Sequence, residues 1–254
     1  MSEQLKDKAL LARQSREDMI SALTAAGYEV SAATPISEVC GYIRWMNGLR
    51  DICIAATAKD GTDTFIALDT WNAMSDNAKL AYTVFGVRVR AYGRSIVVAL
   101  TDTSTSATAW SKTKSGYSFP GVTICTTAQQ LDENSDGYAL TEHLVTNTTC
   151  AKYADAAAAA WAYKNSTDDA HQWYMPSMRE ATILQTYATE INAALATVPG
   201  TRSVQDGILS ANLNTTSLCY VATYNALGIQ GSAATYYSGT FDVGTFCRPV
   251  CRAD

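Results

Sequence analysis

The stretch Trp173-Tyr174-Met175-Pro176-Ser177-Met178-Arg179-Glu180 does more than any other to determine the fold. Proline disfavours helical backbone in the residue before it, so Met175 is expected to be extended. Ser177 is a good helix N-cap, and Glu180 lies three positions later, which is the spacing of a capping box. The stretch therefore predicts an extended segment that becomes a helix at Ser177.

Helical patterns lie on both sides of this stretch. Downstream, apolar residues recur at helical spacing and predict a helix from Ser177 to Thr197, which Pro199 and Gly200 end. Its inner side would carry Met178, Ala181, Leu184, Ile191 and Leu195. Upstream, five consecutive alanines predict a helix from Cys150 to Lys164, because alanine has the highest helix propensity.

Strand patterns lie farther out on both sides. Three runs rich in β-branched and aromatic residues precede the helices, and three more follow them. They are Asp63 to Leu68, Thr83 to Arg90, Ser95 to Thr101, Ser217 to Tyr224, Thr235 to Ser238 and Gly244 to Arg252. Residues 91–94 are expected to close a hairpin, and Ser75 to cap a short helix that reaches about Ala81. No element is predicted within residues 102–149.

The N-terminal fifty residues have the pattern of two helices. Apolar residues from Glu3 to Ala26 form one helical stripe, and Thr34 followed by Pro35 predicts a second helix that Gly48 ends. The stripe fits a helix that lies on its own domain, or an assembly helix that joins copies of the chain into a dimer or trimer. In the second interpretation the contact residues would be Leu5, Ala12, Met19 and Leu23. The whole order predicts an α+β fold with an antiparallel sheet, divided into a helical module, 1–50, and a larger domain, 51–254.

Composition excludes some classes of function. The formal net charge is −5 and no cluster of Lys and Arg is present, so nucleic-acid binding is not expected. No run of eighteen apolar residues occurs, and the N-terminus lacks the apolar core of a signal peptide, so neither membrane insertion nor export by that route is expected. The seven cysteines form no CxxC pair and are expected to be mostly small buried residues.

Motifs for catalysis are sparse, and we expect neither an enzyme nor a cofactor. The two histidines, His143 and His171, lie in no nucleophile or metal spacing. Asp168, Asp169 and His171 form a polar cluster that fits an interhelical loop better than a catalytic site. A polysaccharide hydrolase stays as an alternative, with Asp132 and Glu142 as its first carboxylate pair to test.

One string resembles the first half of a calcium loop. Asp132, Asn134 and Asp136 alternate before Gly137, as oxygen ligands do before the turn glycine. The second half fails, because the twelfth position is His143 where a bidentate Glu is needed. The string fits an Asx-rich turn at least as well, so no metal site is expected.

Aromatic residues among Gly, Ser, Thr and Asn give the best pattern for binding. Tyrosine surrounded by small polar residues is typical of adaptable binding loops. The residues expected to contact a ligand are Asn212, Asn214, Tyr224, Tyr236, Tyr237 and Phe241. About half of the aromatic rings, among them the tryptophans and Tyr220, are expected to be core.

Residues 150–252 resemble a C-type-lectin-like domain of the bacterial and phage kind. That family shows an Ala-rich helix, a W-x-L-P-S-x-x-E signature, a serine-rich strand and a closing V-R-P-V-like strand. Trp173 to Glu180 match the signature, Leu209 to Tyr224 match the serine-rich strand, and Phe246 to Val250 match the closing strand. The E-P-N and W-N-D motifs of animal lectins are absent, so the resemblance does not imply calcium-dependent sugar binding.

The front end resembles a short helical module near the start of phage tail and fibre proteins. The match comprises Ala25 to Val30, Thr34 to Glu38, and Tyr42 with Ile43. Together the two resemblances imply a virion protein of a tailed phage, of the crAss-like type, that acts as a head or tail fibre or decoration subunit. The implied partners are other copies of the chain, other virion proteins through the N-terminal helices, and a host surface glycan or protein. An internal virion connector without a receptor is the alternative.

Overall fold

The structure is a computed structural model that describes residues 15–21, 23–24, 30–35, 39, 51–91, 94–106, 109–111, 119–205, 207–215, 218–222 and 245–253. The chain divides into two compact units. The first comprises Met1–Asp51 with Arg90–Arg94, and the second comprises Ile52–Val89 with Ser95–Asp254.

The described part of the first unit has a small apolar core of its own. Residues 15–21 and 23–24 are helical. Leu23 and Val39 are fully buried, and Met19, Ile20 and Val30 pack against them. Arg16 donates through Nη2 to the carbonyls of Ala32 (2.8 Å) and Thr34 (2.7 Å), which ties the turn at 30–35 to the helix.

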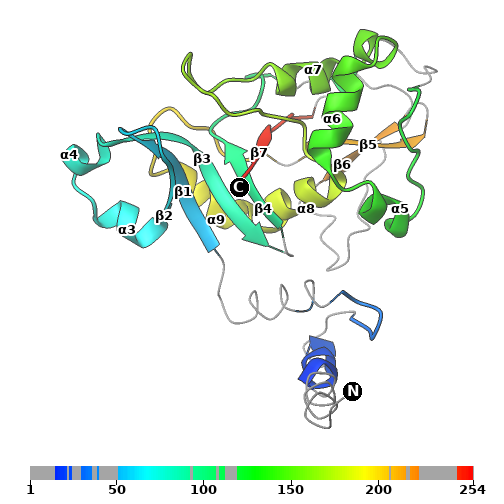
Figure 1. Cartoon of the computed structure of the whole chain (residues 1–254), viewed down its shortest axis with the longest axis horizontal. Helices are drawn as coiled ribbons and strands as arrows, with labels where there is room; N and C mark the ends of the chain where they lie inside the picture. Colours follow the sequence, from blue (N-terminus) through cyan, green and yellow to red (C-terminus); the bar gives the residue numbers. More distant parts are fainter. Residues whose placement is uncertain are drawn as a thin grey trace, which may run out of the picture. The chain divides into compact units, whose positions relative to one another are not determined.

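The second unit contains a five-stranded sheet with the order β2-β1-β3-β4-β7 (Figure 1). Its strands are β1 (Asp51–Ala58), β2 (Asp63–Ala67), β3 (Tyr82–Ala91), β4 (Arg94–Ala99) and β7 (Val250–Arg252). β1 pairs antiparallel with β2, and β4 pairs antiparallel with β7. The three predicted front strands are therefore confirmed, and β1 is a strand that the sequence pattern did not reveal.

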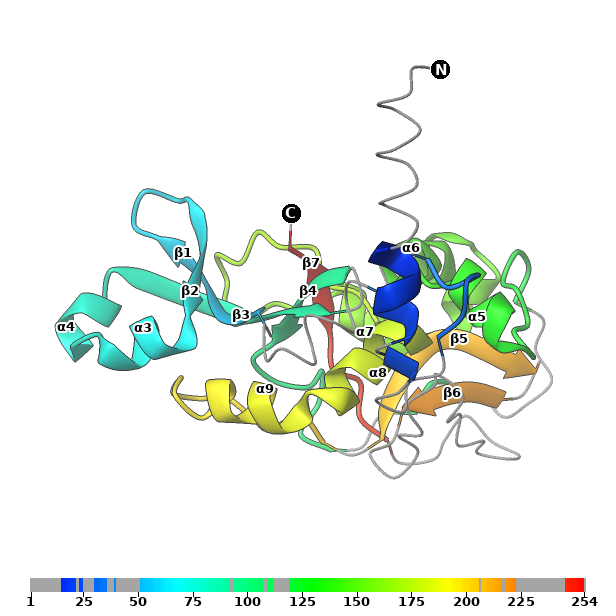
Figure 2. The same cartoon turned by 90° about the horizontal axis from the view of Figure 1, so that it is seen from below.

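Two short helices, α3 (Leu68–Ala73) and α4 (Asp76–Lys79), connect β2 to β3 and lie at one end of this unit (Figure 2). The Ser75 hydroxyl accepts a hydrogen bond from the Ala78 amide, so the predicted cap is confirmed. Trp71 is buried and meets Tyr82 edge to face.

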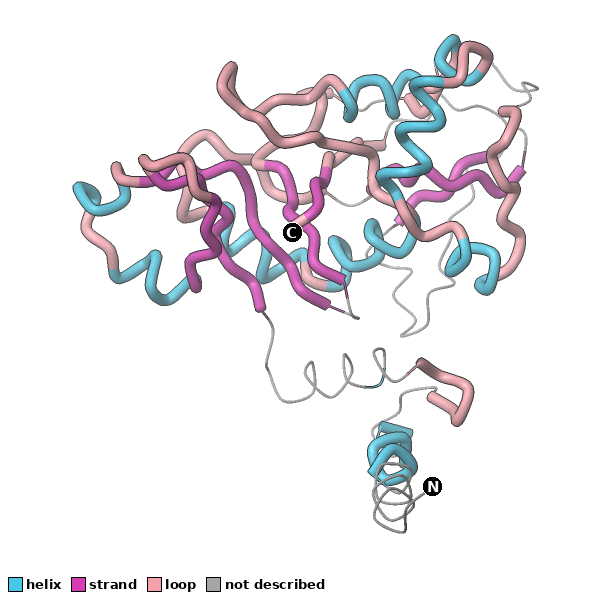
Figure 3. Tube along the Cα trace, viewed as in Figure 1, coloured by secondary structure: helices cyan, strands magenta, loops and turns pink. Residues whose placement is uncertain are grey.

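The remaining helices and a two-stranded sheet lie beside the larger sheet (Figure 3). They are α5 (Ala128–Glu133), α6 (Gly137–Thr146), a 3-10 turn (Cys150–Lys152), α7 (Asp155–Trp161), α8 (Met178–Thr186), α9 (Ala188–Leu195), β5 (Ile208–Thr215) and β6 (Leu218–Ala222). The α+β class with an antiparallel sheet is confirmed. α5 and α6 occupy the region 102–149, where no element had been predicted.

Both predicted long helices differ from the observed ones at identifiable residues. The helix expected from Cys150 to Lys164 is a 3-10 turn followed by α7, and the helix expected from Ser177 to Thr197 is interrupted at Tyr187 (φ −108°, ψ 19°). The five residues predicted on its inner side are nevertheless all buried.

Two apolar clusters fill the second unit. One lies on the five-stranded sheet and includes Phe85, Val97 and Trp173. The other joins α6 and α7 to β5 and β6 and includes Trp110, whose indole N–H donates to the Ser210 carbonyl at 3.0 Å. The segment 173–178 contributes to both clusters, since Trp173 lies in the first and Met175 in the second.

The predicted capping box at the start of α8 is confirmed. Ser177 Oγ accepts from the Glu180 amide, and the Glu180 carboxylate accepts from the Ser177 amide at 2.7 Å. The Tyr174 hydroxyl donates to the same carboxylate at 2.9 Å. Only glycine fits at position 137, because a Cβ there would lie 2.5 Å from the Ser177 nitrogen and would overlap Glu180 Oε2.

The C-terminal segment closes the domain around a buried arginine. Arg248 is fully buried, and its Nε lies 2.8 Å from Asp102 Oδ1 in an ion pair whose carboxylate side chain is 1% exposed. The guanidinium donates further to the carbonyls of Ala99 (3.0 Å), Arg202 (2.9 Å) and Ser203 (2.8 Å). One side chain therefore joins three segments that are distant in the sequence.

The predicted closing strand, Gly244 to Arg252, is shorter than expected. Only Val250–Arg252 pairs with β4, while Phe246 forms a separate bridge to Ile208. Pro249 lies between the two pairings and has no amide hydrogen to donate to a ladder, although its carbonyl accepts from Ala99 at 3.0 Å. Val250 instead exchanges two backbone hydrogen bonds with Tyr174, at 2.9 and 3.0 Å.

Six of the seven cysteines lie in the described residues, and all six are buried and form no disulfide. Their expected role as small buried residues is confirmed. Among the described helices, none combines the length and apolar character that crossing a membrane requires.

Candidate functional site

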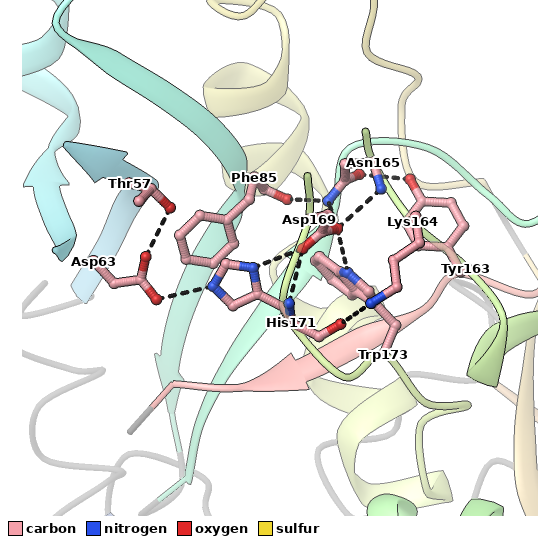
Figure 4. A network of polar contacts seen from close by, with 9 residues as sticks. All are labelled: Thr57, Asp63, Phe85, Tyr163, Lys164, Asn165, Asp169, His171 and Trp173. Carbon is pink, nitrogen blue, oxygen red and sulfur yellow. Dashed lines mark hydrogen bonds and ion pairs between the residues drawn. The ribbon is translucent and has the colours of Figure 1, made fainter. Parts of the chain in front are cut away.

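The loop between α7 and α8 gathers a network of polar contacts (Figure 4). Its sequence, Asn165-Ser166-Thr167-Asp168-Asp169, consists of residues whose side chains bond to nearby backbone and so favour turns over helix. The Asp169 amide closes one such turn on the Ser166 carbonyl. The loop then leads directly into Trp173 and the capping box of α8.

Asp169 is the centre of this network. Its carboxylate accepts from the amides of Asn165 and His171, both at 3.0 Å, and from the Trp173 indole N–H at 2.7 Å. The side chain is only 2% exposed. Burial alone would raise the pKa of Asp169, but the hydrogen bonds from Asn165, Trp173 and His171 outweigh it, and the pKa is lowered below its ordinary value. Asp169 is therefore held as a carboxylate.

His171 lies between two carboxylates, as Figure 4 shows. Its Nδ1 is 2.7 Å from Asp169 Oδ1, and its Nε2 is 2.9 Å from Asp63 Oδ2 at the start of β2. The ring stacks on Phe85, with 3.8 Å between ring centroids and 19° between planes. Asp63 is 45% exposed on its side chain, so the outer contact faces solvent while the inner one is enclosed.

Further bonds attach the loop to the sheet. Asn165 Nδ2 donates to the Phe85 carbonyl at 2.6 Å, and the Tyr163 hydroxyl donates to Asn165 Oδ1 at 2.6 Å. Lys164 Nζ donates to the His171 carbonyl at 2.9 Å. Burial raises the pKa of Tyr163, whose hydroxyl also lies 2.9 Å from that of Thr101. These contacts hold the α7–α8 loop against β3 and against Thr101, which follows β4.

The chemistry that this arrangement can perform depends on which group contacts Nε2 of His171. A buried aspartate that orients a histidine is the inner half of a nucleophile-activating triad. Here Nε2 faces Asp63, whose other oxygen accepts from the Thr57 hydroxyl at 2.7 Å. The Thr57 hydroxyl therefore donates to the Asp63 carboxylate and not to the His171 imidazole. The arrangement is suited to holding the β1–β2 hairpin and the α7–α8 loop together through charge-assisted hydrogen bonds.

Two residues predicted to bind a ligand are instead used inside the domain. Asn212 is 1% exposed, accepts from the Met178 amide at 2.7 Å and donates to the Asn134 carbonyl at 2.8 Å. Asn214 is 8% exposed and donates to the Tyr220 hydroxyl at 2.8 Å. Both amides therefore position the start of α8 and β5–β6. Tyr220, expected as a core residue, is buried.

The other predicted ligand residues, Tyr224, Tyr236, Tyr237 and Phe241, lie outside the described residues. The same holds for Leu5 and Ala12 of the predicted assembly stripe. Of the remaining two, Leu23 is fully buried against Val39 of its own chain, and Met19 is partly buried at the edge of that cluster.

The half calcium loop spans the last residues of α5 and the turn that leads to α6, and each of its three oxygen-bearing residues has a structural partner. Asp132 pairs with Arg179. Asn134 is the C-cap of α5 and donates to the Gln130 carbonyl. Asp136 caps α6 and pairs with Arg252 at 2.9 Å. Within the described part of the chain, no group of three or more His, Cys, Asp or Glu side chains is placed to hold a metal ion.

The link between His171 and Asp63 was not predicted, although the cluster of Asp169 and His171 was noticed in the sequence. Its partner lies 108 residues away, so no local spacing marks the pair. The Asp102–Arg248 pair was missed for the same reason.

The comparisons with known proteins add no relative. No protein-family model matches the chain, and neither the curated proteins nor the solved structures give a significant match.

Proposed function

We propose that this chain is a structural subunit of a tailed-phage virion, a head or tail fibre or decoration protein, which displays a lectin-like domain for attachment to the host surface. The proposal starts from the two resemblances in the sequence. It is supported by the positions of the signature residues. Trp173, Tyr174 and Met175 are buried, Ser177 and Glu180 form the capping box, and Arg248 is the buried clamp of the closing segment.

The observation that carries the binding part of the proposal is how the ends of the segment 223–244 are anchored. Ile208 pairs with Ala222 on one side and with Phe246 on the other. Neighbouring strands are separated by about 4.8 Å, so these two flanking residues lie on the order of 10 Å apart. The described residues on the two sides of 223–244 therefore lie close together, with Ala222 buried and Phe246 partly buried.

The composition of that segment supports a binding role. It reads TYNALGIQGSAATYYSGTFDVG from Thr223 to Gly244 and contains one charged residue, Asp242, among Tyr, Gly, Ser and Thr. Tyrosine among small polar residues gives contact area at low entropic cost, which is why binding loops use it. A rigid domain that holds the ends of such a segment resembles the general arrangement of a scaffold with binding loops. We therefore propose Tyr224, Tyr236, Tyr237 and Phe241 as the ligand contacts.

Adsorption to host cells tests this function. The purified full chain, labelled with a fluorophore, should bind cells of the host saturably. Tyr236→Ala with Tyr237→Ala should lower that binding at least tenfold, since aromatic contacts at interface centres each contribute about 2 kcal/mol or more. Leu80→Ala is the matched control, because Leu80 is 72% exposed and lies between α4 and β3. Saturable binding that the double variant retains in full would refute the proposed site, and absence of any saturable binding would refute the attachment role.

A further inference from the structure

His171 has carboxylate oxygens at both ring nitrogens, and this geometry depends on its charge. The distances are 2.7 Å from Nδ1 to Asp169 and 2.9 Å from Nε2 to Asp63. An imidazolium donates from both nitrogens, whereas a neutral imidazole has one N–H and one lone pair. In the neutral ring one nitrogen lone pair would therefore face a carboxylate.

The two contacts are unequal, and this decides which one the neutral ring keeps. Asp169 is enclosed, and apart from the His171 ring it is held by the amides of Asn165 and His171 and by the Trp173 indole N–H, so its carboxylate is fixed in position. The Asp63 side chain is 45% exposed, and its other oxygen accepts from the Thr57 hydroxyl. A neutral His171 would keep its proton on Nδ1, toward Asp169, and present the Nε2 lone pair to Asp63. The outer contact is then repulsive, and Asp63 is free to turn to water.

Among the described residues, the charged groups that bond to His171 come from β2 and from the α7–α8 loop. The charged side chains in contact with His171 among the described residues are Asp63 from β2, Asp169 from its own loop, and Lys164, which donates to the His171 carbonyl. β3 contributes the apolar face of Phe85, and Trp173 contributes a ring edge. β1 contributes Thr57, which reaches His171 only through Asp63.

We infer that His171 is a proton-dependent latch between the α7–α8 loop and the β1–β2 hairpin. In the protonated form it joins Asp169 to Asp63 and fastens the hairpin. In the neutral form it keeps Asp169 and releases Asp63, so the hairpin opens more often. The latch changes state when the His171 ring gains or loses its second N–H. The inference does not depend on the proposed virion function.

Hydrogen exchange of the full chain, measured by mass spectrometry at pH 5.5 and pH 8.0, tests the latch. After correction for the intrinsic exchange rate at each pH, amides of β2 should lose protection about two- to fivefold at pH 8.0 relative to amides of α8. This range corresponds to the value of a partly exposed ion pair. His171→Gln should remove the pH dependence, because glutamine does not titrate.

Asp63→Asn tests whether the latch depends on the charge of the Asp63 carboxylate or only on contact between the two side chains. Its side-chain amide can donate to the neutral Nε2, so the β2 amides should show equal or greater protection at pH 8.0 than at pH 5.5. Asp168→Asn, at the exposed neighbour of Asp169, is the matched control and should keep the wild-type dependence. Equal corrected protection of β2 at both pH values in the wild type, or an unchanged loss in Asp63→Asn, would overturn the inference.

Discussion

Replacing Arg248 with alanine should be among the most damaging single changes in the second unit. The guanidinium is fully buried, pairs with Asp102 and donates to three backbone carbonyls. Arg248→Ala leaves that carboxylate buried without its counter-charge and leaves the carbonyls without their donors. Removing one partner of a buried pair costs about 3–5 kcal/mol, so we expect a loss of that size. Since domains are stable by only about 5–15 kcal/mol, this is a large fraction of the total.

Urea unfolding followed by near-ultraviolet circular dichroism gives the measurement, because Trp110 and Trp173 each lie in one of the two apolar clusters of the second unit. Arg248→Lys keeps the charge but not the planar fork of donors, and should fall between the wild type and Arg248→Ala. The double change Arg248→Met with Asp102→Leu removes both charges and should recover much of the loss, since apolar replacement of a buried pair is often neutral. A loss of unfolding free energy below about 1 kcal/mol in Arg248→Ala would refute the idea that Arg248 holds these segments together.

Three further changes test the site and the scaffold. Ser177→Ala removes the cap of α8 and should cost about 1 kcal/mol in urea unfolding, whereas an unchanged midpoint would contradict the observed capping box. Asp169→Asn should destabilise the domain at pH 7 by about 2–3 kcal/mol. Because the pKa of Asp169 is lowered in the folded chain, the contribution of Asp169 to the free energy of unfolding is complete above the ordinary pKa of about 4 and is lost as the pH falls through the folded pKa. The Asp169→Asn variant should therefore lose less stability in acid than the wild type does. Burial raises the pKa of Cys219 and of Cys247 to about 12, so iodoacetamide at pH 7.5 should leave both thiols unlabelled in the native chain. Peptide mass spectrometry measures this labelling, and rapid labelling of either cysteine in the native chain would contradict their burial.

Features with local causes could be predicted from the sequence. The capping box of Ser177 and Glu180, the cap at Ser75 and the strands on either side of residues 91–94 all depend on residues a few positions apart. The interactions that stabilise these features join residues close together in the chain, so the amino-acid sequence alone is enough to predict them. The α+β class followed from the order of these local elements.

Features that depend on packing could not be predicted in the same way. β1 has four consecutive buried residues, Cys53 to Ala56, because it lies between β2 and β3, and a short apolar run without alternation does not distinguish a strand from a helix. The alanine run of 156–160 indicates a helix, but propensity alone did not locate its ends. Residues 128–146 form α5 and α6 although their sequence resembled a loop with a calcium-like turn.

The network around His171 also combines local features that the sequence predicts with a long-range contact that it does not. The turn at Asn165 to Asp169 follows from residue type, and the sequence marks Asp169 and His171 as neighbours. The contact with Asp63 arises only when β2 and the α7–α8 loop are brought together by the sheet. Asn212 was expected to face a ligand because it is polar and lies in a serine-rich strand, yet the α5–α6 turn and α8 enclose it.

The place of this chain in a particle tests the central proposal most directly. Under the proposed function the chain comes from a tailed phage, whose virions, purified through a density gradient, would be examined by mass spectrometry and by cryo-electron microscopy with an antibody against the chain. We predict that the chain co-purifies at a fixed copy number and that the antibody marks the outside of the head or tail. Absence of the chain from purified particles, or a position inside an intact shell, would contradict the proposal.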